Sequence, residues 1–310
     1  AYRLLRLVIT ESMAMVVARK GSEAPDGVRL VEVEVEPGYE EAEREAWRQA
    51  KWVLGQTEAI VDLSHAHVFR REQEKVPGVS WIWHDPKIMQ PPAPKTNVFA
   101  LSDWQARRHR EKTMQRIEVF DIICADGDVY RYDNNQSGER WLSIAILDRN
   151  KGQGVLARAC EENGIPLDVI GRAVDVGVRR EVVGCERWVR YFGEVDEGEK
   201  IERMKKARGV LYWPSYPPEM GEAHSHKLVE ALMMGLPCIV QTGRDGALGE
   251  VFKGFVGLAD QEDPLPEVVR LWGQNEHRMD RENLARAAHE RWDYREVTQR
   301  LRGLLGELKR

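Results

Sequence analysis

The sequence has no apolar run that approaches the roughly 18–20 residues needed to cross a bilayer, so we expect no membrane-spanning helix. Cysteine is scarce, and the four thiols form no C-x-x-C pair, which favours reduced thiols and a cytoplasmic protein. A basic excess is also missing, because 46 Lys and Arg stand against 51 Asp and Glu, for a net charge of −5. This balance argues against a nucleic-acid partner.

What the sequence does contain is an alternation of short apolar runs with helical segments, over 310 residues, a length that suits two domains. A polar, turn-rich stretch at 133–138 predicts the boundary between them. We expect a domain at 1–135, a domain at 136–290 and a terminal helix at 291–310. Strands that alternate with helices predict an α/β fold with mostly parallel sheets. The expected strands are Arg3–Thr10, Val28–Val35, Ala59–Leu63, Val79–His84, Asn97–Leu101, Trp141–Leu147, Leu167–Ile170, Trp188–Phe192, Val210–Trp213 and Pro237–Val240.

The most informative stretch is Ser215–Val240, where a loop rich in Pro and Gly leads into a short helix that ends at Gly235. This helix is apolar almost all round, which is typical of a helix packed inside a domain. Glu230 lies in its middle, and Glu222 lies in the loop before it, with seven residues between the two acids. Backbone N–H groups at His224–Lys227 would offer an anion site at the helix N-terminus. The pattern indicates a cleft for a phosphorylated, hydroxyl-rich ligand.

A simpler interpretation of the two acids stays open. Glu230 could form an ordinary i,i+3 ion pair with Lys227, one helical turn back. Glu222 could be an ordinary loop acid, since acids mark functional sites only in some proteins.

Glu222-x7-Glu230, followed by Ala231, Gly235, Pro237 and Ile239, resembles the E-x7-E signature of retaining GT-B glycosyltransferases, especially glycosyltransferase family 4. The resemblance implies two Rossmann-like domains that face each other across a cleft, with a reduced N-terminal domain and a last helix that crosses back to it. It also implies a metal-independent hexosyltransferase without a cofactor. The donor would be a nucleoside diphosphate sugar, based on UDP or GDP, and the anomeric configuration would be retained.

Further matches extend the resemblance. Trp83-His84-Asp85 resembles the family strand whose histidine lies beside the transferred sugar, and Lys151-Gly152 resembles the family "KG", whose lysine binds the donor phosphates. The resemblance therefore implies three catalytic residues, namely Glu222, His84 and Lys151. It implies that Glu230 accepts hydrogen bonds from the ribose, and that the other donor-binding residues are Lys151, Arg149, Arg172, His224, Ser225, His226, Lys227 and Val195.

The sequence departs from the family pattern in two places. The family's Gly-Gly loop after the first strand corresponds here to 11–14, which contain no glycine. The family arginine before the lysine corresponds to Ala145 or Ile146, which leaves Arg149 and Arg172 as candidate replacements. The acceptor, whether a saccharide, a lipid-linked molecule or a small molecule, and the oligomeric state cannot be read from these residues.

Several alternatives remain at this point. A protein that binds a sugar nucleotide without catalysis, or another GT-B enzyme such as a sugar-nucleotide epimerase, would keep Glu230 and Lys151. Two His-x-His pairs, at 65–67 and 224–226, leave a metal hydrolase open, although their spacing is weak evidence for a metal site. The basic stretch at 104–112 fits either a solvated helix face or peripheral contact with the inner face of an anionic membrane.

Overall fold

The structure is a computed structural model, and it describes residues 15–19, 29–33, 41, 44–49, 60–62, 78–82, 97–113, 116–134, 138–215, 225–242, 247–260, 264–275 and 280–308. The chain divides into two compact units, one of residues 1–124 together with 294–310 and one of residues 125–293. The expected strand at 3–10 lies outside the described residues. No helix in the described part of the chain combines the length and the apolar character that a bilayer crossing requires.

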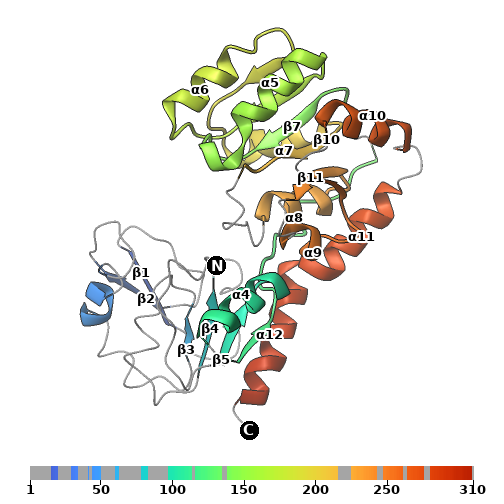
Figure 1. Cartoon of the computed structure of the whole chain (residues 1–310). Helices are drawn as coiled ribbons and strands as arrows, with labels where there is room; N and C mark the ends of the chain where they lie inside the picture. The colour runs from blue at the N-terminus through green and yellow to red at the C-terminus, as the bar shows by residue number, and fades with distance from the viewer. Residues whose placement is uncertain are drawn as a thin grey trace. The chain divides into compact units, whose positions relative to one another are not determined.

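The first unit contains two parallel sheets (Figure 1). One is two-stranded, formed by β1 (Met15–Arg19) and β2 (Arg29–Val33). The other has the strand order β3, β4, β5, β6, with bounds Ile60–Asp62, Gly78–Ile82, Asn97–Ala100 and Ile117–Val119. The last helix, α12 (Tyr294–Leu308), belongs to this unit.

Ser102 caps the start of helix α4 (Asp103–Thr113), because its hydroxyl accepts a hydrogen bond from the Gln105 N–H at 3.2 Å. The helix packs on β5 and β6. Trp104, the aromatic residue of the basic stretch, is buried, and the Arg108 guanidinium lies 4.8 Å from its ring centroid. This aromatic ring is therefore part of the helix packing and not available to a membrane.

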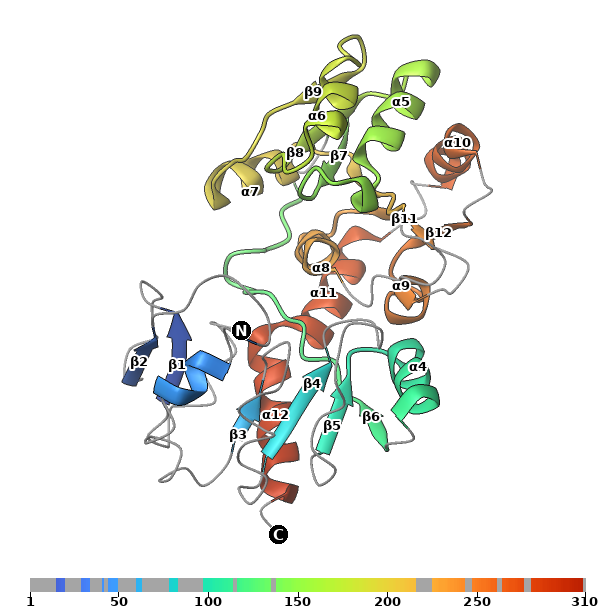
Figure 2. The same cartoon turned by 60° about the vertical axis from the view of Figure 1, so that its left-hand side comes forward.

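The second unit is built on one six-stranded parallel sheet with the order β12-β11-β10-β7-β8-β9 (Figure 2). Counted along the chain from β7, the order reads 3-2-1-4-5-6, that of a doubly wound Rossmann sheet. The order reverses between β7 and β10, and ligands of such sheets bind beyond the carboxyl ends of the strands at this reversal. The six strands in chain order are Trp141–Ile144, Leu167–Ile170, Val189–Tyr191, Gly209–Tyr212, Cys238–Thr242 and Gly257–Asp260.

In the described part of this unit, seven α-helices connect or follow the strands of the sheet. In chain order they are α5 (Gln153–Asn163), α6 (Val176–Val183), α7 (Glu197–Lys205), α8 (His226–Met233), α9 (Ala247–Val251), α10 (Leu265–Asn275) and α11 (Arg281–Trp292). Residues of α5, α6 and α10 form one hydrophobic core with the sheet. Helix α8 contacts β10, β11 and α11, and its apolar residues are fully buried, as its all-round apolar sequence predicted.

The parallel α/β architecture predicted from the alternation is confirmed. The expected strand at 141–147 is shorter in the structure, because β7 ends at Ile144 and Leu147 forms only an isolated bridge with Ala173. The helices α6, α9, α10 and α11 and the strands β1, β6 and β12 were not predicted.

Candidate functional site

The loop after β7 carries Lys151 in a fixed backbone conformation. Asp148 accepts a hydrogen bond from the Asn150 N–H at 2.8 Å, and residues 149–151 form a single 3-10 turn. Gly152 then adopts a left-handed conformation with φ of 69°, and helix α5 begins at the next residue. The buried Gln153 amide, oriented with its nitrogen toward the loop, donates to the carbonyls of Ile146 and Lys151 at 3.2 and 3.3 Å. These contacts hold Lys151 at the start of α5.

The loop after β7 also contacts the end of β10. The Ser215 N–H donates to the Asn150 carbonyl at 2.9 Å. A Cβ on Gly152 would collide with the Trp213 carbonyl, so only glycine allows this close approach. The two loops therefore meet at the reversal of the strand order, the place where this sheet topology binds ligands.

The arginines considered as replacements lie at the same edge of the sheet. Arg149 is in the β7 loop, and its guanidinium pairs with the Asp175 carboxylate at 3.1 Å while its side chain is 82% exposed. Hydrogen bonds from the backbone of Val178 and Gly177, together with Arg149, lower the pKa of Asp175 despite some desolvation. Arg172 follows β8, not β7, and is exposed. It adds a positive charge to this edge of the sheet.

Glu230 is the buried acid of α8, and two lysines contact it. The Lys227 ammonium lies 3.1 Å from Oε2 and 3.3 Å from Oε1, so the i,i+3 ion pair that the sequence left open is present. The Lys200 ammonium, from α7, lies 3.0 Å from Oε2. Because the Lys200 and Glu230 side chains are only 8% and 11% exposed, this is a desolvated ion pair.

Lys200 has further partners. Its ammonium donates to the Tyr130 hydroxyl at 2.6 Å and pairs with Glu197 Oε2 at 2.9 Å. The Tyr130 hydroxyl in turn donates to the Glu197 carboxylate. We call Tyr130, Glu197, Lys200, Lys227 and Glu230 the acid–lysine cluster. It contains two formal negative and two formal positive charges, which balance.

The electrostatics of the cluster differ between its two lysines. Burial acts to lower the pKa of Lys200, but the carboxylates of Glu230 and Glu197 outweigh it and raise that pKa. Burial, helped by the neighbouring Lys200, lowers the pKa of Lys227 despite its contact with Glu230. Burial acts to raise the pKa of Glu197, but hydrogen bonds from Tyr130 and Lys200 outweigh it and lower that pKa. Burial and the two acids raise the pKa of Tyr130, which keeps its hydroxyl protonated.

The remaining predicted residues are placed as follows. Ser225 is buried at the N-cap of α8, and its carbonyl accepts from the Val229 N–H at 3.3 Å. His226 is exposed at the first position of that helix, and Val195 is half-buried in the loop between β9 and α7. Glu222, His84 and His224 lie outside the described residues. Lys151, Arg172, Val195 and the start of α8 thus follow four different strands at one edge of the sheet.

Sequence reasoning missed Tyr130 and Lys200. One signal was present: Lys200 and Met204 are the buried positions of α7, spaced i,i+4 as an apolar stripe would be. A lysine at a position of the buried face indicates a charged partner inside the fold. Nothing local in the sequence identifies that partner as Glu230.

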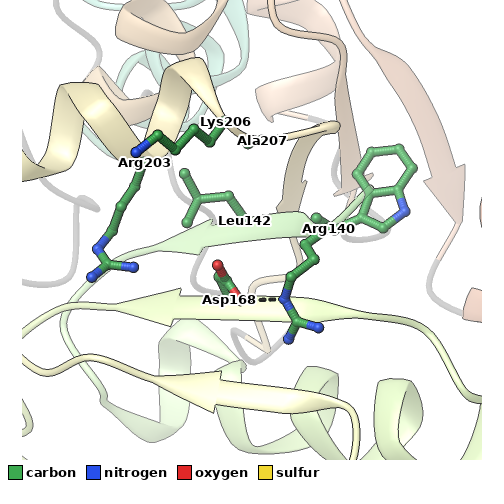
Figure 3. A pocket seen from close by; sticks show the side chains of 7 residues that line it. Arg140, Leu142, Asp168, Arg203, Lys206 and Ala207 are labelled. Atoms are coloured by element: carbon green, nitrogen blue, oxygen red, sulfur yellow. Dashed lines mark hydrogen bonds and ion pairs between the residues drawn. The ribbon is translucent and has the colours of Figure 1, made fainter. Parts of the chain in front are cut away.

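A small cavity of about 60 Å³ lies elsewhere, near the amino ends of β7 and β10 (Figure 3). Its lining includes Arg140, Asp168, Arg203 and Lys206, and none of the predicted site residues. Arg140 is held there through Nε, which pairs with Asp168, and through Nη2, which donates to the carbonyls of Leu167 and Trp188. Among the described residues, no group of three or more His, Cys, Asp or Glu is arranged to hold a metal ion.

No protein-family model and no curated protein matches the chain. Among solved structures it is similar to HepE of Anabaena in complex with UDP and glucose, with a TM-score of 0.73 and 12% identity over 98% of this chain and 94% of that one. It is similar to AviGT4, a glycosyltransferase involved in avilamycin A biosynthesis, with a TM-score of 0.75 and 16% identity over 99% and 87% of the two chains. For WaaG, a glycosyltransferase involved in lipopolysaccharide biosynthesis, the TM-score is 0.70, with 14% identity over 96% and 93%. These likenesses show that the chain has the Rossmann-like fold of GT-B glycosyltransferases.

Proposed function

We propose that this chain transfers a hexosyl group from a nucleoside diphosphate sugar to a hydroxyl acceptor, with retention of the anomeric configuration and without a metal ion. The observation that carries the proposal is the meeting of two loops at the strand-order reversal. The Lys151 loop follows β7, the segment that leads to Glu230 follows β10, and a hydrogen bond of 2.9 Å between Asn150 and Ser215 joins them. This contact supports the proposal, because a Rossmann sheet binds its ligands at the reversal of its strand order.

The proposed chemistry follows from the residue types. The Lys151 ammonium and the N–H groups at the start of α8 stabilise the diphosphate as its bond to the anomeric carbon breaks. The acceptor oxygen forms its bond on the same face, and its proton passes to the departing phosphate oxygen. Glu230 accepts hydrogen bonds from the ribose. Glu222 and His84 complete the proposal through contacts with the transferred sugar.

The neighbouring structures supply the choice of first probes. HepE was crystallised with UDP and with UDP-glucose. A nucleotide donor also fits the charge of the site, since Lys151, Arg149 and Arg172 lie at an edge of the sheet that would face two phosphates.

The test has two stages. A thermal-shift panel of UDP, GDP, ADP and dTDP should identify one nucleotide that raises the melting temperature, because a ligand of the native state stabilises it. The matching sugar nucleotide is then incubated with the protein, and NMR follows the free sugar that slow transfer to water releases. The first anomer formed should be that of the donor.

The outcomes separate the alternatives. Binding without any release of sugar indicates a protein that only binds the nucleotide, and inversion at the anomeric carbon contradicts retention. A matched pair of variants locates the site: Lys151→Met should weaken diphosphate binding at least tenfold, whereas Lys205→Met, which removes an exposed lysine of α7, should not. No thermal shift with any of the four nucleotides would overturn the proposal.

A further inference from the structure

The Glu230 carboxylate is held by one lysine that is fixed and one that is more exposed. An ammonium has three N–H donors, and Lys200 has three acceptors: Tyr130 at 2.6 Å, Glu197 at 2.9 Å and Glu230 at 3.0 Å. Every donor of Lys200 is therefore used within the protein. Its side chain is 8% exposed, so water cannot readily replace these partners.

Lys227 is held differently. Its side chain is 37% exposed, and its ammonium spans both carboxylate oxygens at 3.1 and 3.3 Å. If Lys227 is displaced from Glu230, the Lys227 ammonium can still contact solvent. If Lys200 is displaced, its ammonium remains buried without a partner for its charge. Of the two lysines, Lys227 is the one that a ligand can replace.

The acceptor capacity of Glu230 fits such a replacement. Each carboxylate oxygen can accept about two hydrogen bonds. From the described residues, Oε2 already receives both lysines, while Oε1 receives one contact, from Lys227 at 3.3 Å. If Lys227 moves away, Oε1 can accept two hydroxyl groups while Lys200 still holds Oε2. The two vicinal hydroxyl groups of a ribose match this arrangement.

We propose that Lys200, held by Tyr130 and Glu197, is a positioning residue that orients Glu230 toward the ribose hydroxyl groups of the donor nucleotide, and that Lys227 gives way when the ribose binds. The inference rests on the proposed function and adds residues that the motif does not contain. It also explains why a lysine occupies a buried position of α7, next to Met204 on the same face, where an apolar residue would avoid the cost of desolvation.

The test measures discrimination between ribose and deoxyribose. The probes are whichever of UDP, GDP and ADP binds most tightly, together with its 2′-deoxy and 3′-deoxy forms, and calorimetry gives each dissociation constant. Hydrogen bonds to a charged acceptor predict that the wild type prefers the ribonucleotide by about ten- to hundredfold. Lys200→Met should reduce this preference to about threefold or less, and Lys200→Arg should restore part of it.

Lys205→Met is the matched control, because Lys205 lies on the same helix and forms an i,i+3 ion pair with Glu202 at the surface. It should leave the preference unchanged. If Lys200→Met does not fold, Lys200→Gln takes its place under the same criterion, because it keeps a polar side chain with N–H donors. A purely structural lysine would lower the melting temperature without changing the preference for ribose.

Three results would count against the inference, and they can be told apart. A wild-type preference that survives in Lys200→Met overturns the positioning role and leaves the proposed function standing. A wild type that binds ribo and deoxy forms equally removes the ribose role of Glu230. A wild type that binds none of the diphosphates overturns the proposed function and this inference together.

Discussion

Replacing Lys200 by Met should destabilise the 125–293 unit by an amount that depends on Glu230. Removing one member of a buried ion pair typically costs about 3–5 kcal/mol, because the remaining charge stays desolvated and uncompensated. Here Glu230 keeps Lys227 at 3.1 Å, and Glu197 keeps contact with solvent because its side chain is 50% exposed. We therefore expect Lys200→Met to cost about 2 kcal/mol, below that range.

A double-mutant cycle isolates the contribution of the pair. Glu230→Gln should also cost about 2 kcal/mol, since Lys200 keeps Glu197 and Tyr130 as acceptors. Lys200→Met combined with Glu230→Gln should cost much less than the sum of the single changes, with a coupling of about 1–3 kcal/mol, because neither charge is then left without its partner. The same cycle on Lys205 and Glu202, an exposed pair on α7, should show no measurable coupling.

Native-state hydrogen exchange read by mass spectrometry is the appropriate measurement. Peptides from α7 and α8 report the opening free energy of the region that holds both side chains, and peptides from residues 97–113 of the other unit serve as an internal reference. A coupling below about 0.5 kcal/mol between Lys200 and Glu230 would refute the argument, because the effects of substitutions at distant, independent sites also deviate from additivity by up to that amount.

Two further predictions concern Gly152 in the loop after β7 and the loss of stability at acidic pH. Gly152→Ala should lower the free energy of unfolding by about 1–3 kcal/mol and weaken diphosphate binding in calorimetry, because the residue has a positive φ and its new Cβ would collide with the Trp213 carbonyl. Gly254→Ala is the control, because Gly254 has a similar φ but open space around it. Equal effects of the two substitutions would contradict the role of the collision. Glu197→Gln should destabilise the protein most at neutral pH. The lowered pKa of Glu197 means that its contribution is complete above the ordinary value of 4.5 and is lost as pH falls through the lowered pKa. Melting temperatures of wild type and variant should therefore converge as the pH falls below 4.5, and a constant difference would contradict the assignment.

The sequence by itself determined the local structure of this protein and the identity of its motifs. Strand β8 was predicted with its observed bounds, because an apolar run between turn residues carries its own signal. Helix α8 was predicted as a buried helix, because apolar residues cover its whole circumference. Two motifs could also be recognised directly, because each lies within a short stretch of sequence. They are the spacing of Glu222 and Glu230 and the Lys151-Gly152 pair.

Only the tertiary structure decided what surrounds Glu230. Tyr130 and Lys200 are 70 residues apart, and Lys200 and Glu230 are 30 apart, so no helical or strand period connects them. Their meeting depends on the order of strands in the sheet, which brings the Lys200 side chain of α7 within reach of Glu230 on α8 and which local patterns do not encode. The sequence could offer Lys227 as a partner because it lies one helical turn away. It could not offer Lys200, because a contact across two helices exists only once the sheet that carries them has formed.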